Sequence, residues 1–262
     1  MNYKYKLGFV GCGNMAKAII NGLLDSHLLS ADEMLVSTPN INTPYNGIAF
    51  SNDNKYVLDN CEYVVIAVKP QIYRAIEEQF ADCSAKCLIS IMAGVNTATI
   101  KKASGCEEVV RIMPNTPCSI KEGVSAITTD GASEQSFEFV ERVFGTISST
   151  VRVDESYFDA VTSISGSGPA YVYYFIKAVT DAGVEGGLSY EQSKQLALKT
   201  FIGASKMVEN STDSLDTLID KVCSKGGTTI QAIDTFRQTN VAENIKLGIE
   251  KCRKRSEELS KG

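Results

Sequence analysis

The stretch Gly8-Phe9-Val10-Gly11-Cys12-Gly13-Asn14-Met15-Ala16 decides the fold of the first half of the chain. The apolar run that ends at Val10 predicts a buried strand, and the apolar residues that follow at helical spacing predict a helix. Between them lies the G-x-G-x-x-G/A fingerprint of dinucleotide-binding turns. Gly11 permits the tight turn, Gly13 lets the backbone approach a pyrophosphate, and Ala16 allows the helix to pack closely. The sequence therefore predicts a nucleotide-binding unit at its start.

Further predicted strands extend this unit into an α/β domain. Each apolar run ends in a loop of small or polar residues, as expected of strands buried on both faces of a parallel sheet. In open parallel sheets, ligands bind at this carboxyl edge. The predicted strands cover residues 62–68, 87–92, 109–113, 124–128 and 149–153, with a helix over 137–144. We predict a Rossmann-like dinucleotide-binding domain over residues 1–156.

The end of the second strand, residues 34–37, bears on the choice of cofactor. In an NAD-selective site an acidic residue at this position binds the ribose 2′-hydroxyl. Here the chain reads Ser37-Thr38-Pro39-Asn40, with no acid to repel a 2′-phosphate and no arginine to bind it. NADPH is therefore the predicted cofactor, with NADH as the alternative. Pro39, Pro44 and Asn46-Gly47 also predict an abbreviated crossover before the next strand.

After residue 156 the sequence pattern changes from strands to helices. Prolines disappear apart from Pro169, and apolar residues recur every three or four positions. This pattern predicts an all-α domain over residues 157–262. Its apolar side chains lie on more than one helix face, which predicts a homodimer. The segment Ser165-Gly166-Ser167-Gly168-Pro169 interrupts a helical pattern, as expected where a ligand approaches the helix backbone.

A second glycine-rich turn, Val222-Cys223-Ser224-Lys225-Gly226-Gly227-Thr228-Thr229-Ile230, lies between two helical patterns. Its paired glycines let backbone N–H groups approach a ligand. Its threonines are predicted to cap a helix that begins at Ile230, whose unpaired N–H groups attract a carboxylate or phosphate. A plain helix-to-helix joint, with a glycine C-cap and a threonine N-cap, explains the same residues. The turn alone leaves both interpretations open.

A nucleotide domain followed by a helical domain predicts hydride transfer, but a proton donor is hard to find. The single histidine, His27, lies in a polar stretch away from the strand ends and is predicted to be a surface residue. Carbonyl reductases need a His, Lys or Tyr to protonate the alkoxide. A protonated imine becomes a neutral amine on accepting hydride. The sequence therefore favours C=N reduction, and we interpret the remaining candidate acids, Tyr171, Tyr173 and Lys177, as core or surface positions.

Composition excludes several classes of protein. The net charge is −5, and the basic cluster at residues 251–255 is flanked by glutamates, so we expect no DNA or RNA partner. The eight cysteines form no C-x-x-C pair and are predicted to be small buried residues, with no metal site. No window approaches the roughly 18 apolar residues of a membrane span, and we expect no leader peptide. These features predict a cytoplasmic protein.

Taken together, these features resemble the pyrroline-5-carboxylate reductase family. The resemblance runs nearly from end to end, and the glycine-threonine turn with the SGSGPAY segment is highly specific. It implies a helical domain that intertwines with its mate in a dimer, often in larger rings. It also implies the last step of proline biosynthesis, reduction of 1-pyrroline-5-carboxylate to L-proline by NADPH or NADH. The matching motifs are GFVGCGNMA at 8–16, AVKP at 67–70, AGV at 93–95, RIMPNTP at 111–117, FDAVTSISGSGPAYVY at 158–173, GASKM at 203–207 and RSEEL near the C-terminus.

The resemblance implies a role for each matching residue. The pyrophosphate would lie on Gly11, Cys12, Gly13, Asn14 and Met15. The rest of the cofactor would contact Ser37 and Thr38 beside the ribose, Asn54, and Ala67, Lys69 and Pro70 on the nicotinamide side. The substrate would bind to Ser224, Gly226, Gly227, Thr228 and Thr229, with backbone N–H groups on its carboxylate. The Thr229 hydroxyl would lie near the ring nitrogen and is the implied catalytic group.

The chain departs from the family pattern at Cys223-Ser224-Lys225, where the family has threonine, serine and proline. Loss of the proline is expected to loosen the turn, and Lys225 adds a positive charge. Two other functions stay open. A β-hydroxyacid dehydrogenase-like reductase needs a lysine after a glycine-rich helix start, where this chain has none before Lys177. A non-catalytic nucleotide-binding protein is the other alternative, although no basic arm or long linker favours it.

Overall fold

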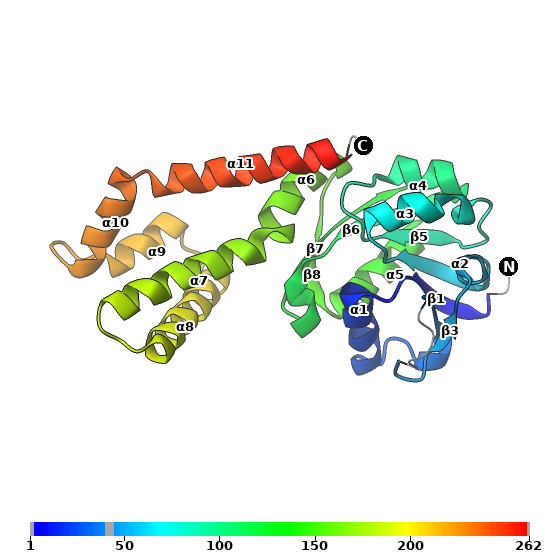
Figure 1. Ribbon diagram of the computed structural model, residues 1–262, viewed down its shortest axis with the longest axis horizontal. Helices are drawn as coiled ribbons and strands as arrows, with labels where there is room; N and C mark the ends of the chain where they lie inside the picture. Colours follow the sequence, from blue (N-terminus) through cyan, green and yellow to red (C-terminus); the bar gives the residue numbers. More distant parts are fainter. Residues whose placement is uncertain (1–2, 40–44, 261–262) are drawn as a thin grey trace. The chain divides into compact units, whose positions relative to one another are not determined.

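One sheet of eight strands lies at the centre of the first half of the chain (Figure 1). The structure, a computed structural model, describes residues 3–39 and 45–260. The strand order is β3-β2-β1-β4-β5-β6-β7-β8, and neighbouring strands are parallel except for β6 with β7. The strands are β1 (Tyr5–Val10), β2 (Met34–Ser37), β3 (Ala49–Ser51), β4 (Cys61–Ile66), β5 (Cys87–Ser90), β6 (Glu108–Met113), β7 (Gly123–Asp130) and β8 (Ser148–Arg152). The order reverses beside β1, which pairs with both β2 and β4.

Helices cover both faces of this sheet, because alternate strand residues point to opposite sides. In β4, Tyr63 and Val65 belong to the core under α1 and α5, whereas Val64 and Ile66 belong to the core under α2, α3 and α4. All four side chains are buried, which explains the continuous apolar run. The helices are α1 (Asn14–Asp25), α2 (Asn54–Asn60), α3 (Pro70–Ile76), α4 (Thr97–Ser104) and α5 (Glu134–Gly145), with short turns η1 (Ala31–Glu33), η2 (Glu77–Phe80) and η3 (Thr116–Ile120). The predicted Rossmann-like α/β fold is confirmed.

The connection from β2 to β3 contains no helix in the part that the structure describes. Its residues 45–48 form a turn, in which Asn46 and Gly47 have φ of 52° and 76°. This agrees with the predicted abbreviation of the crossover. Pro44, which contributed to that prediction, lies outside the described residues.

The chain after β8 is helical, as the spacing of its apolar residues predicted. Contacts group Met1–Ser167 with Cys252–Gly262 into one compact unit and Gly168–Lys251 into another. The division into domains at residues 156 and 157 remains a prediction. A π-helical turn, η5, interrupts the α-helical pattern at the segment that contains Gly166. The elements are η4 (Glu155–Tyr157), α6 (Phe158–Val161), η5 (Thr162–Gly166), α7 (Gly168–Glu185), α8 (Tyr190–Glu209), α9 (Leu215–Val222), α10 (Thr228–Gln238) and α11 (Val241–Ser260).

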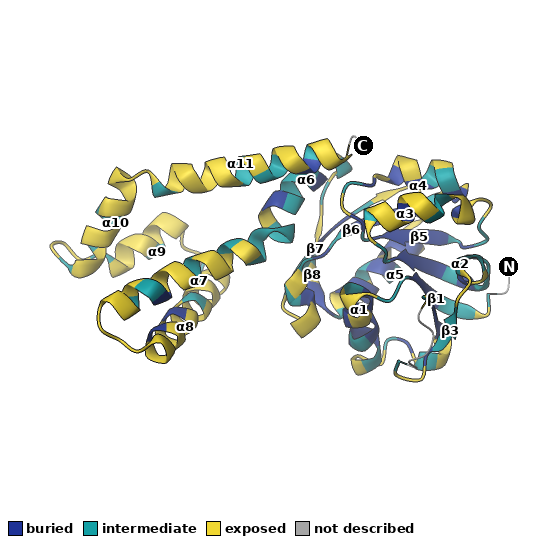
Figure 2. Ribbon diagram, viewed as in Figure 1, coloured by how far each residue is buried: buried dark blue, intermediate teal, exposed yellow. Residues whose placement is uncertain are grey.

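Most residues of the helical unit are exposed (Figure 2), and many large apolar side chains are among them. Tyr173 is 64% exposed, Leu196 60%, Met207 65% and Val222 63%, and they come from three different helices. Helices with apolar residues on several faces are typical of surfaces that pack against another chain. No helix within residues 3–39 or 45–260 has the length and hydropathy that a membrane span requires.

Candidate functional site

The glycine turn after β1 has the geometry of a pyrophosphate-binding turn. Gly11 has φ of +99°, and its N–H donates to the Ser37 carbonyl at 2.9 Å. A Cβ added there would lie 2.8 Å from the Ala67 carbonyl oxygen. Gly13 is the N-cap of α1, and a Cβ added there would meet nothing within 4 Å. The first N–H groups of α1 therefore face open space, where they attract an anion.

The residues expected beside the ribose lie together at the end of β2. The Ser37 hydroxyl donates to Asn54 Oδ1 at 2.6 Å, and the Asn54 amide donates to Gln79 Oε1 at 2.8 Å. Ser37 is 1% exposed, so Asn54 rather than Ser37 presents polar atoms near the surface. The Thr38 N–H donates to the Ser51 carbonyl at 3.1 Å. Gln79 was missed from the sequence, because only the packing of η2 brings it to Asn54.

The residues expected on the nicotinamide side follow β4, the neighbour of β1. The Ala67 N–H donates to the Val10 carbonyl at 2.9 Å, which joins the ends of the two strands. Lys69 is the N-cap of α3, and Pro70 occupies its first turn. These residues therefore lie beside the glycine turn, at the point where the strand order reverses. Dinucleotides bind at that point in sheets of this kind.

A cavity of about 820 Å³ lies beside the start of α3. It is formed by α3, the loop after β5, the turn η5 and the last residues of α11, all within the first unit. Within the cavity lining, the Cys252 thiol donates to Ser167 Oγ at 3.3 Å. Its lining residues are Pro70, Gln71, Arg74, Ala93, Gly94, Thr162, Ser167, Cys252, Arg255, Ser256, Glu258 and Leu259. Ala93 and Ser167 belong to motifs that the sequence analysis quoted, whereas nothing in the sequence singled out Arg74.

An ion pair between a buried arginine and a half-buried glutamate holds the elements around this edge of the sheet. The Arg111 side chain donates to Glu155 at 2.9 Å and lies over the Phe158 ring, 4.5 Å from its centroid. Glu155 also accepts from the Thr97 N–H at 2.9 Å and from its hydroxyl at 2.6 Å. The carboxylate thus joins β6, α4 and the start of the helical segment. Removing Glu155 would leave the Arg111 guanidinium buried without its ion-pair partner, so the pair helps to fix this geometry.

The glycine-threonine turn lies in the second unit and is largely exposed. Gly226 has φ of +73°, and the Gly227 N–H donates to the Ser224 carbonyl at 2.9 Å. The sequence-based helix start at Ile230 is wrong: α10 begins at Thr228, with Gly227 as its N-cap and no side-chain cap. The threonines were expected to cap the helix, but they form its first turn because Gly227 already adopts the extended N-cap conformation. The N–H groups of this turn are therefore left without a capping side chain.

The surroundings of three of the candidate proton donors, His27, Tyr173 and Lys177, do not favour proton transfer. His27 is exposed, as predicted, with φ of 55°. Lys177 is exposed and pairs with Asp181 at 2.5 Å, a hydrogen bond that raises the pKa of Lys177. A higher pKa makes the ammonium a poorer proton donor. Tyr173 is 64% exposed on α7, whereas Tyr171 is half-buried.

The eight cysteines are all free thiols, four of them buried. Burial alone raises the pKa of Cys61 to about 12, so this thiol stays protonated and unreactive. No group of three or more metal-ligating side chains gathers anywhere in residues 3–39 and 45–260. Cys61 therefore behaves as a small apolar residue, whereas Cys12, Cys83, Cys223 and Cys252 are only half-buried.

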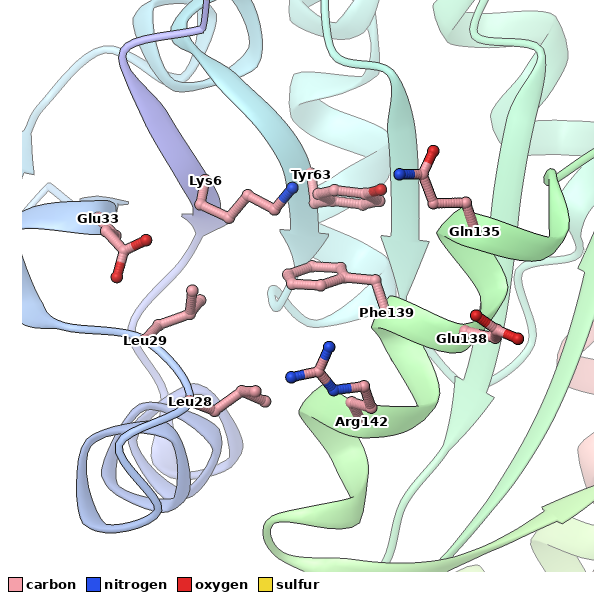
Figure 3. Close-up of a pocket in the computed structure, with 9 residues that line it drawn as sticks. All are labelled: Lys6, Leu28, Leu29, Glu33, Tyr63, Gln135, Glu138, Phe139 and Arg142. Carbon is pink, nitrogen blue, oxygen red and sulfur yellow. The ribbon is translucent and has the colours of Figure 1, made fainter.

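A second cavity, of about 330 Å³, lies among charged and aromatic side chains of the first unit (Figure 3). The Lys6 ammonium lies 5.0 Å from the centroids of both the Tyr63 and Phe139 rings and pairs with Glu62 at 2.8 Å. Lys6 and Tyr63 come from the first half of their strands, so this cavity lies toward the amino edge of the sheet. Ligands of open parallel sheets bind at the other edge, and we do not assign the cofactor here.

Two family models match the chain. One, described as pyrroline-5-carboxylate reductase dimerisation, matches residues 155–259. The other, described as NADP oxidoreductase, coenzyme F420-dependent, matches residues 6–94. One model thus matches the helical half of the chain, and the other matches part of the α/β half.

Curated relatives and solved structures match nearly the whole chain. The pyrroline-5-carboxylate reductase of Aquifex aeolicus is 35% identical, over 97% of this chain and 97% of its own length. That of Arabidopsis thaliana is 33% identical, over 98% and 96%. The structure of a pyrroline-5-carboxylate reductase from Coxiella burnetii matches with a TM-score of 0.90 at 30% identity, over 99% of this chain and 100% of that one. A Plasmodium falciparum pyrroline carboxylate reductase with NADP bound matches with a TM-score of 0.89 at 30% identity, with the same coverage.

Proposed function

The chain belongs to the pyrroline-5-carboxylate reductase family. From this premise we propose which residues bind the cofactor and the substrate and how they promote the reaction. The reaction is transfer of hydride from NADPH to the C=N bond of 1-pyrroline-5-carboxylate, which gives L-proline, the last step of proline biosynthesis. The observation that carries the proposal is the open N-terminus of α1 at the reversal of strand order.

The residues of the first unit fit NADPH. The pyrophosphate would lie on the N–H groups of the Gly11, Cys12, Gly13, Asn14 and Met15 turn, since Gly13 has no side chain to obstruct it. Asn54, held by Ser37, would contact the ribose together with Thr38. Ala67, Lys69 and Pro70 would border the nicotinamide, which supplies the hydride when the cofactor is bound. These roles rest on the contacts of the turn and on the match of each residue to the family motif.

The second unit would supply the group that binds the substrate. In Ser224, Gly226, Gly227, Thr228 and Thr229, backbone N–H groups at the start of α10 suit a carboxylate, because the helix has no capping side chain there. The Thr229 hydroxyl would accept a hydrogen bond from the protonated ring nitrogen and so orient the C=N bond. Thr229 is the residue we propose as catalytic, through orientation rather than proton transfer. Lys225 adds positive charge beside this turn.

No side chain needs to deliver a proton in this reaction. Hydride adds to the carbon of the protonated imine, the π electrons move to nitrogen, and the product is a neutral ring amine. This chemistry matches a chain in which Tyr173 is exposed and Lys177 is held in an ion pair with Asp181. It also disfavours a carbonyl substrate, which would leave an alkoxide to be protonated.

The chain carries the dimerisation region of the family and is expected to act as a homo-oligomer. We propose a homodimer through the helical domain, consistent with the exposed apolar side chains of α7 and α8, and further assembly into a ring of dimers. Sedimentation that shows a stable, active monomer would contradict this. The free cysteines suit a reducing compartment, and we propose the cytoplasm.

One assay tests the proposed function most directly. NADPH oxidation would be followed with 1-pyrroline-5-carboxylate, with a 3-hydroxyacid in the reverse direction, and with a panel of carbonyl compounds. We expect turnover of the cyclic imine alone, with a higher kcat/KM for NADPH than for NADH. Turnover of the hydroxyacid instead would favour a β-hydroxyacid dehydrogenase-like reductase, and NADH preference would contradict the interpretation of Ser37 and Thr38.

A further inference from the structure

Two cysteines that are far apart in the sequence have their thiols in contact. Cys83 lies in the loop before β5, and Cys106 lies in the loop before β6. A side-chain hydrogen bond joins the two thiols. Cys106 Sγ lies 3.5 Å from the Ala85 carbonyl oxygen, and the Ala85 N–H donates to Cys83 Sγ. Both sulfur atoms therefore meet at Ala85, inside the first unit.

The loop that carries Cys83 is fixed on both sides of this residue. The Ser84 N–H donates to Asp59 Oδ1 at 3.2 Å, and the Tyr3 hydroxyl donates to the Ser84 carbonyl at 2.9 Å. The Lys55 ammonium donates to the carbonyls of the two residues before Cys83, at 2.8 and 2.9 Å. Because these bonds already hold the loop, a covalent bond between the two thiols would cost little further conformational entropy.

The two loops lead into neighbouring parallel strands. Cys87, the first residue of β5, pairs with Glu108, the first residue of β6. Cys83 and Cys106 come just before this paired position and so lie at the amino edge of the sheet. The glycine turn at Gly11 follows β1 and lies at the carboxyl edge. A covalent bond between the loops would therefore join β5 to β6 at the edge opposite the proposed cofactor site.

The two thiols differ in acidity and in exposure. The hydrogen bond from Cys83 lowers the pKa of Cys106, although burial opposes this effect. The same hydrogen bond, together with burial, raises the pKa of Cys83. The thiolate is the reactive form of cysteine, so Cys106 is the sulfur that attacks first and Cys83 the one that follows. Cys83 is half-buried and Cys106 is 5% exposed, which favours a small oxidant over a protein partner.

We infer that Cys83 and Cys106 form a modification site, a dithiol that hydrogen peroxide converts into a disulfide between β5 and β6. This site is independent of the proposed function. The Cys106 thiolate attacks one peroxide oxygen, the O–O bond breaks, and a sulfenic acid forms while the departing hydroxide takes the Cys83 proton. The Cys83 sulfur then forms the S–S bond and displaces the second hydroxide, which takes the proton that Cys106 gave to the solvent.

The electrons and protons of this reaction balance. The two thiols together lose two electrons and two protons, and the peroxide accepts them and leaves as two molecules of water. In a reducing compartment thiols would reverse the reaction, so the disulfide would form only while peroxide is present.

The test is oxidation of the reduced full chain with hydrogen peroxide, followed by alkylation of the remaining thiols and peptide mapping by mass spectrometry. We expect the free thiols to fall by two, with one cross-linked pair of peptides that contains Cys83 and Cys106, and dithiothreitol should restore both. The oxidised chain should have an apparent Tm about 5 °C higher, because the disulfide restricts the unfolded chain. Recovery of the two residues unlinked, as thiols or as sulfinic acids, would overturn the inference.

Cys87→Ala is the matched control, because Cys87 is buried, interacts electrostatically with Cys106 and is the alternative partner for it. This variant should form the same disulfide and show the same rise in Tm as the wild type. Cys83→Ser should show neither, and its Cys106 should remain as a sulfenic acid that dimedone traps. A rise in Tm that persists in Cys83→Ser would contradict the assignment, as would a disulfide that joins Cys106 to Cys87 or to a second chain.

Discussion

Two glycine turns, each followed by the N-terminus of a helix, are held in very different ways. The turn at Gly11 is fixed by its neighbours, because a Cβ there would meet the Ala67 carbonyl at 2.8 Å. The turn at Gly226 is exposed, and a Cβ there would meet nothing within 4 Å. The first turn is thus shaped by the packing of its own sheet. The second is held by contacts within the turn itself, such as the hydrogen bond from the Gly227 N–H to the Ser224 carbonyl.

The largest expected effect separates two roles within the first turn. Gly11→Ala combines a φ of +99° with a backbone clash and is expected to lower the free energy of unfolding by about 2 to 5 kcal/mol. Gly13→Ala should change it by about 1 kcal/mol or less, since its Cβ meets only open space. Yet Gly13→Ala should raise KM for NADPH at least tenfold, because the methyl group takes the place of the pyrophosphate. Urea unfolding and kinetics distinguish these outcomes, and equal stability losses would contradict the comparison.

The next effect concerns Thr229, in the second turn. Thr229→Val removes the hydroxyl and keeps the shape, so kcat/KM for 1-pyrroline-5-carboxylate should fall about tenfold, the value of one hydrogen bond. Stability should hardly change, because Thr229 is exposed. Thr235→Val, on the same helix, is the control and should leave kcat/KM as it is. An unchanged kcat/KM in Thr229→Val would return the turn to a plain helix joint.

A smaller effect is expected at Gly226. Gly226→Ala places a methyl group at a φ of +73°, which strains the backbone by about 1 kcal/mol without any clash. Thermal unfolding should show this small loss, well below that of Gly11→Ala. KM for 1-pyrroline-5-carboxylate should rise a few-fold while KM for NADPH stays constant. A loss of stability as large as that of Gly11→Ala would show that the second turn is packed as firmly as the first.

The smallest effect is expected at the candidate acids, which lie in neither turn. Tyr171→Phe and Lys177→Met should leave kcat within about tenfold of wild type, or ~1.4 kcal/mol of barrier, because the protonated imine needs no acid. The hydrogen bond with Asp181 raises the pKa of Lys177, so the ammonium holds its proton through neutral pH. A much larger loss in a folded variant would show that a side chain does deliver the proton.

The sequence predicted most of the structure of the first turn, at Gly11, and much less of the structure of the second, at Gly226. The glycine fingerprint after a buried strand is a local pattern whose backbone demands are the same in every such fold. Ser37 and Asn54 were expected near the cofactor, but their mutual hydrogen bond and the contact with Gln79 depend on the packing of β2, α2 and η2. In the second turn the start of α10 was misplaced by two residues, since a threonine suits both an N-cap and a first turn.

By itself, the sequence determined the alternation of strands and helices, the glycine turn and the change to a helical half. These depend on hydrophobic spacing and on the backbone freedom of glycine, which act over a few residues. Only the tertiary structure decided that β6 and β7 are antiparallel and that α3 turns Arg74 toward a cavity formed partly by the end of α11. It also decided that Glu155 joins β6 to α4. Such contacts join residues that are far apart in the chain, and a local sequence pattern does not indicate which distant side chain a residue will contact.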